Sequence, residues 1–159
     1  MFTRILLAID GSDYSKQALP AAIEVAKKFE GSVFVLNVSE HDRSRAAVFS
    51  LESPADAYTL VYDAVAVLHR AGVTADGQVH HVAAGHVAKD IVETARTKES
   101  DLIVMGSRGL SDVQGLLLGS VTHKVMQLSH VPVLVTRAPI AVKVDVSHPI
   151  TALQAALAI

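Results

Sequence analysis

Short apolar runs rich in β-branched residues alternate along this chain with longer segments whose apolar residues recur every three or four positions. The runs have the length and composition of buried strands, and the longer segments have the period of amphipathic helices. Five strands are predicted, over residues 3–9, 32–38, 76–83, 101–105 and 131–136. Four helices are predicted, over residues 15–29, 54–71, 86–98 and 119–129. Residues 39–53 show no sustained period and are predicted to form a loop.

This alternation indicates an α/β fold, in which helices cover both faces of one doubly wound parallel sheet. The 159 residues are enough for a single domain with a full hydrophobic core. In such a sheet the ligand lies beyond the carboxyl ends of the strands, where the strand order reverses. Two segments could lie there, residues 10–13 after the first strand and residues 106–120 after the fourth.

The composition argues against several classes of function. A net charge of −2, scattered lysine and arginine, and the absence of tryptophan disfavour nucleic-acid binding. The absence of cysteine excludes disulfides, thiolate metal sites and cysteine nucleophiles. No apolar run approaches the ~20 residues that span a bilayer, and residues 1–5 lack a secretory pattern. We therefore expect a cytoplasmic protein without membrane insertion.

The eight histidines do not predict a metal site. His80 and His81 would point to opposite faces of a strand, and the others are dispersed without metal-ligand spacing. Magnesium is expected only as the companion of a bound nucleotide, because it needs few protein ligands.

The most informative stretch has the spacing Gly-x-x-Gly, nine residues, Gly-Ser, from Gly106 and Gly109 to Gly119 and Ser120. Gly106 and Gly109 alone would fit a plain turn equally well. The second pair opens a helix, where free amides and the helix dipole favour an anion. The side chains that could add a cation and hydroxyl donors are those of Arg108, Ser120 and Thr122. The stretch therefore predicts a site for a triphosphate.

The stretch matches neither of the two common nucleotide motifs. No lysine precedes Ser120, as a Walker A loop requires, and a dinucleotide fingerprint would follow the first strand. That strand ends instead in Asp10-Gly11-Ser12-Asp13, whose two carboxylates would repel a bare pyrophosphate. Ser12 or Asp13 is predicted to cap the next helix, and capping is also an alternative role for Asp10.

Over residues 1–137 the chain resembles the ATP-binding universal stress proteins. The glycine spacing is similar to their nucleotide loop without a gap, and residues 4–12, 101–105 and 132–135 look like the segments that frame it. The resemblance implies a five-stranded sheet of order 3-2-1-4-5, a dimer, and bound ATP. Residues 138–159 form an extension beyond this nucleotide-binding domain.

The resemblance also implies a role for each residue that matches the family's site. Asp10 would lie on the ribose or metal side. The residues beside the base and in the adenine pocket would be Ala8, Ile9, Val38 and Met105. The residues that hold ribose and phosphates would be Gly106, Arg108, Gly109, Gly119, Ser120, Val121 and Thr122.

Three functions are compatible with this pattern. The first is a regulatory, ATP-sensing dimer that acts on an unidentified protein partner in a stress response. The second is a nucleotide-hydrolysing or nucleotidyl-transferring enzyme of the related pyrophosphate-loop type, whose Ser-Gly-Gly-x-Asp-Ser and His-x-Gly-His signatures are absent here. The third is an interaction subunit that has lost ATP, against which the glycine spacing argues. No acid–base pair is recognisable near the site, so we expect at most slow ATP hydrolysis.

The extension has its own apolar pattern. Alternation of Ile140, Val142, Val144 and Val146 predicts a strand. A stripe of Ile150, Leu153 and Leu157 after Pro149 predicts a short helix. Such a helix is marginal alone, and the fifth strand is predicted to be a sheet edge that needs a partner. We expect that strand to pair with its symmetry mate and the extension to pack across the dimer; the alternative is a disordered extension.

Overall fold

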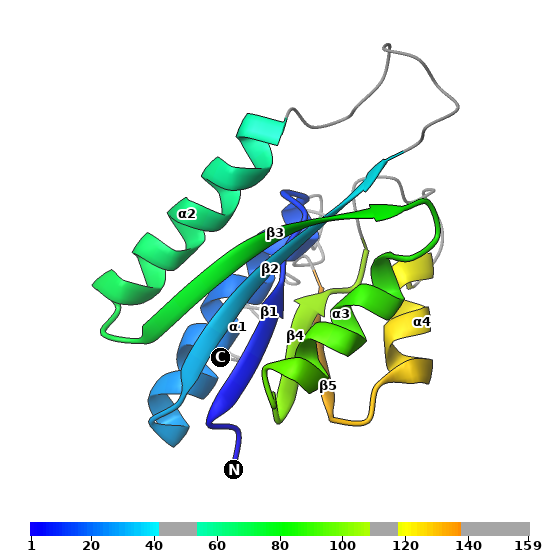
Figure 1. Ribbon diagram of the computed structural model, residues 1–159. Coiled ribbons are helices and arrows are strands. Elements are labelled where there is room, and N and C mark those ends of the chain that lie inside the picture. Colours follow the sequence, from blue (N-terminus) through cyan, green and yellow to red (C-terminus); the bar gives the residue numbers. More distant parts are fainter. Residues whose placement is uncertain (42–53, 109–117, 138–159) are drawn as a thin grey trace, which may run out of the picture.

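A computed structural model describes residues 1–41, 54–108 and 118–137, and Figure 1 shows the arrangement. The elements are β1 (Arg4–Ala8), α1 (Asp13–Phe29), β2 (Ser32–His41), α2 (Pro54–Arg70), β3 (Thr74–Ala83), α3 (Val87–Thr97), β4 (Leu102–Gly106), α4 (Ser120–Leu128) and β5 (Val133–Thr136). All four strand pairs are parallel, and the sheet order is β3-β2-β1-β4-β5. The predicted α/β fold and strand order are confirmed.

Helices α1 and α2 cover one face of the sheet, and α3 and α4 cover the other (Figure 1). Side chains of β1 alternate between the two cores: Ile5 and Leu7 face α1 and α2, whereas Leu6 and Ala8 face α3 and α4. Because β1 is buried on both faces, its sequence is apolar without a polar alternation. No helix within the described ranges is long and apolar enough to cross a membrane.

Several boundaries differ from the prediction. Strand β2 runs to His41, so the prediction of a loop was wrong for residues 39–41. Strand β3 begins at Thr74, two residues early, and the two strands pair over ten residues. The Glu40 carboxylate also accepts a hydrogen bond of 2.9 Å from the Gly85 amide just past β3. Pairing between neighbours therefore extends strands whose local patterns are weak.

Candidate functional site

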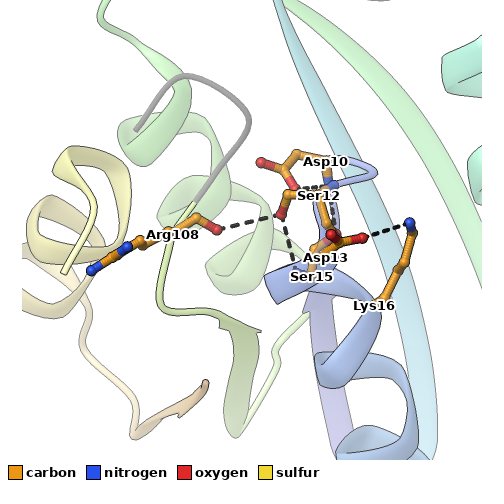
Figure 2. Close-up of polar contacts among 6 residues, drawn as sticks. All are labelled: Asp10, Ser12, Asp13, Ser15, Lys16 and Arg108. Carbon is orange, nitrogen blue, oxygen red and sulfur yellow. Dashed lines mark hydrogen bonds and ion pairs between the residues drawn. The ribbon is translucent and has the colours of Figure 1, made fainter. Parts of the chain in front are cut away.

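The loops that follow β1 and β4 meet at the reversal of strand order. β1 and β4 are neighbours, and the sheet continues from them in opposite directions, to β2 and to β5. The two predicted segments are therefore adjacent, and the Ser12 hydroxyl lies 3.5 Å from the Arg108 carbonyl oxygen (Figure 2). This is where a doubly wound sheet binds its ligand.

Ser12 organises the first loop. Its Oγ accepts a 3.2 Å hydrogen bond from the Ser15 amide, which makes Ser12, one of the two predicted candidates, the N-cap of α1. The Asp10 Oδ1 atom accepts hydrogen bonds from the Ser12 amide, at 3.0 Å, and from the Ser12 hydroxyl, at 2.7 Å. Asp10 does not cap α1 itself. Its hydrogen bonds hold Ser12, the residue that does.

Ser12→Ala is expected to lower the free energy of unfolding by about 1–2 kcal/mol, because one hydroxyl serves both the helix cap and Asp10. Denaturant unfolding measures this loss. Ser32→Ala is the matched control: its hydroxyl makes one exposed, 3.4 Å bond to Thr3, and we expect a change below about 0.5 kcal/mol. Equal losses in the two variants would contradict the central role of Ser12.

The start of α4 is tied to the end of β4. The Gly119 amide donates to the Ser107 carbonyl at 2.7 Å, and the Thr122 hydroxyl donates to the Gly106 carbonyl at 2.9 Å. Gly119 is the N-cap and makes no side-chain cap hydrogen bond, so no side chain of its own covers the amides of the first turn. These amides lie at the carboxyl ends of the strands (Figure 1). The arrangement can accept an anion, since the positive end of the helix dipole lies there.

Two residues of the glycine stretch, Gly106 and Thr122, have structural roles. The Thr122 side chain is buried and its hydroxyl proton goes to Gly106. A Cβ at Gly106 would lie 2.8–2.9 Å from backbone atoms of Tyr14 and Ser15. Gly106 therefore permits the close approach of α1, a reason that the sequence pattern did not reveal. Ser120 is exposed, Val121 is partly buried, and Gly109 lies outside the described residues.

The predicted base-side residues divide between the two faces of the sheet. Ala8, Val38 and Met105 belong to the core cluster under α3 and α4, and Ala8 pairs in register with Met105. The Ile9 side chain lies in the opposite cluster, and its carbonyl accepts a 3.0 Å hydrogen bond from the Asn37 side chain. The structure thus brings three of the four together and separates Ile9 from them.

Arg108 is held by the first turn of α1. Its guanidinium donates to the Tyr14 hydroxyl at 3.2 Å and lies 5.4 Å from the centre of that ring. Figure 2 shows the side chain extending away from Asp10 and Ser12. The cation is therefore kept off the Asp10 carboxylate by its contact with Tyr14.

The second carboxylate of the first loop belongs to Asp13. The Lys16 ammonium lies 2.8 Å from it, and this hydrogen bond and charge lower the pKa of Asp13. Both side chains are largely exposed, so the pair partly offsets the negative charge without burying it.

The two ring nitrogens of His80 both lie close to polar side chains. His80 Nδ1 lies 2.7 Å from an Asp90 oxygen, and its Nε2 lies 3.3 Å from Gln78. Among the residues that the structure describes, no three histidine or acidic side chains gather so as to hold a metal ion.

Comparison with known proteins identifies the family. The model of the universal stress protein family matches residues 1–137. This chain belongs to the universal stress protein family. The universal stress protein YxiE of Bacillus subtilis (strain 168) is 36% identical over an alignment that covers 86% of this chain and 100% of that protein.

Solved structures share the fold of this universal stress protein. The structure of the Methanocaldococcus jannaschii protein MJ0577 has a TM-score of 0.75 at 25% identity, covering 89% of this chain and 99% of that one. A universal stress protein in complex with cAMP has a TM-score of 0.64 at 24% identity, covering 84% and 96%. One from Archaeoglobus fulgidus, in complex with dAMP, has a TM-score of 0.64 at 22% identity, covering 86% and 99%.

Sequence reasoning on this universal stress protein missed two residues at the site. Tyr14 orients Arg108, and nothing in its position within a helix pattern signalled that role. Asn37 is fully buried and bonds to the Ile9 carbonyl. A lone polar residue within the apolar run of β2 was a usable signal, because a buried amide needs a hydrogen-bond partner.

Proposed function

We propose that this universal stress protein binds ATP beyond the carboxyl ends of β1 and β4 and acts as a nucleotide-sensing dimer. The observation that carries the proposal is the start of α4. Its N-cap is a glycine without a side-chain cap, and two hydrogen bonds, from Gly119 and Thr122, anchor it to the end of β4. A fixed set of amides at the reversal of strand order is suited to phosphate.

The position of each residue determines the role that we assign to it in the proposed site. Ala8, Val38 and Met105 share one side of the sheet and would form the apolar surface beneath the adenine. Asp10 would lie on the ribose and metal side. The groups proposed for the phosphates are the backbone at Gly106, Gly109, Gly119, Ser120, Val121 and Thr122 and the Arg108 guanidinium. Ile9 would support the site from the other face.

The solved structures with cAMP and dAMP support an adenine nucleotide, since both ligands are adenine nucleotides held by proteins of this fold. Magnesium would arrive with ATP, with phosphates and water as most of its ligands. Asp10 is the acidic residue of the proposed site that could add a protein ligand.

Isothermal titration calorimetry with ATP, GTP and adenosine tests the proposal. We expect one ATP per chain and weaker binding of adenosine, because it lacks the phosphates. We also expect weaker binding of GTP, because guanine has more polar groups to place against the apolar surface of Ala8, Val38 and Met105. Absence of any heat with ATP, or equal affinity for all three ligands, would contradict the assignment of an ATP site.

Arg108→Ala is expected to weaken ATP binding by about 1.5–3 kcal/mol, or roughly 10- to 150-fold, and to leave adenosine binding almost unchanged. The reason is that its proposed contact is a charge-assisted hydrogen bond to phosphate. Arg96→Ala, which removes an exposed arginine paired with Glu93 on α3, is the control and should change neither affinity. Equal losses of affinity for ATP and adenosine would show that Arg108 does not contact the phosphates.

The dimer is proposed through β5, which is an edge strand of the sheet. The Ser107 amide donates to the Thr136 carbonyl at 2.7 Å, so the loop after β4 is bonded directly to the end of β5. A nucleotide that shifts Ser107 would change the position of this edge and the surface offered to a partner. The cytoplasmic location and the identity of a protein partner stay predictions.

A further inference from the structure

An apolar groove of about 310 Å³ lies at the opposite end of the sheet from the proposed nucleotide site. Its walls come from the segment before β1, the last turns of α1 and the start of β5, and include Phe2, Val25, Phe29, Pro132 and Leu134. Phe29 and Leu134 are each 38% exposed. Two large apolar side chains are thus left uncovered beside an edge strand.

The groove is built with backbone strain. Phe2 has a φ of +63°, a left-handed conformation that is unfavourable for a bulky residue. Its ring packs edge-to-face on Phe29, with ring centres 5.5 Å apart and planes at 84°. A phenylalanine normally avoids this conformation. Here the strained backbone places the Phe2 ring in the wall of the groove.

We propose that the groove of one protomer receives the C-terminal segment, residues 149–157, of a second copy of this chain. The proposal rests on the dimer through β5. The chain continues for 22 residues after Arg137, and their apolar stripe is Ile150, Leu153 and Leu157. This stripe lies outside the described residues, and its chemistry matches the aliphatic and aromatic walls of the groove.

Strand direction favours a segment supplied by the second copy. In an antiparallel β5 pair, the carboxyl end of the second copy's strand lies beside the amino end of this one. Pro132, at that amino end, lines the groove, so the second copy's chain leaves its strand at the groove itself. The chain's own continuation after β5 starts at the other end of the strand, about 13 Å away over four residues, and would have to turn back to bring residues 149–157 to the groove.

Disulfide trapping in the full chain tests this arrangement, because the protein has no native cysteine. The variant carries Val25→Cys in the groove and Leu153→Cys on the stripe. Under mild oxidation we expect a covalent dimer, of twice the 16.8 kDa chain mass. The single-cysteine variants and the pair Val25→Cys with Gln154→Cys, off the stripe, should give far less. An internal disulfide within a monomer, or no disulfide, would overturn the proposal.

Sedimentation equilibrium gives a second, independent readout. Leu153→Asp is expected to raise the dimer dissociation constant at least about tenfold, whereas Gln154→Asp, with the same added charge one residue away, should leave it nearly unchanged. Equal effects, or none, would overturn docking of the segment. A monomeric wild-type protein would overturn the dimer and the docking together, while calorimetry with ATP would still report separately on the nucleotide site.

Discussion

Gly119→Val is expected to reduce ATP affinity at least about hundredfold and to leave the fold intact. Gly119 is buried where α4 begins, so a β-branched side chain there would occupy the space proposed for the phosphates. Its backbone, at φ −71° and ψ 157°, is in the extended region that valine also favours. The poorer N-cap is expected to cost about 1 kcal/mol of stability.

Gly119→Ala separates crowding from capping. Alanine is as poor an N-cap as valine, so we expect the two variants to be similarly stable. Because alanine adds only one carbon, we expect its ATP affinity to lie between those of the wild-type protein and Gly119→Val. Calorimetry and denaturant unfolding on both variants give the comparison. If the Gly119→Val variant binds ATP as tightly as the wild-type protein does, the phosphates do not lie at the start of α4.

Gly106→Ala is expected to lower the free energy of unfolding by about 3 kcal/mol, with any effect on ATP following from the distorted fold. The new Cβ would lie 2.8–2.9 Å from backbone atoms of Tyr14 and Ser15, which cannot rotate away as a side chain can. Helix α1 or strand β4 must move. Chemical denaturation monitored by circular dichroism measures the loss.

Gly72→Ala provides the contrast. A Cβ there meets no atom within 4 Å, but the residue has a φ of +80°, so only backbone strain opposes the change. We expect a loss of about 1 kcal/mol. A Gly106→Ala protein no less stable than Gly72→Ala would show that α1 can shift at little cost and that the close contact does not require glycine.

The sequence was sufficient for the parts of the fold that depend on local patterns. The apolar run of β1 and the period of α3 predicted those elements, and the helix cap was narrowed to Ser12 or Asp13, of which the structure shows Ser12. The additional residues of β2 were missed because their side chains are polar, and their extended conformation depends on pairing with β3. Pairing between distant segments leaves only a weak trace in the local pattern.

The candidate site shows the same division. The α/β pattern located the two loops that meet at the reversal of strand order, and the glycine spacing singled out the second of them. It did not reveal that Gly106 makes room for α1, or that Tyr14 holds Arg108. Both are contacts between residues more than ninety positions apart. The resemblance to the family grouped Ile9 with Ala8, although neighbours in a strand point to opposite faces of the sheet.

The central claim is that ATP binds between the loop after β1 and the start of α4. An amide-resolved NMR titration of the full chain with ATP and Mg²⁺ tests it most directly. We predict the largest shifts at the first-turn amides of α4, those of Ser120, Val121 and Thr122, with no comparable change at Phe2 or Phe29 in the apolar groove. Saturating ATP that leaves the first three amides unmoved, or that shifts the groove instead, would contradict the account.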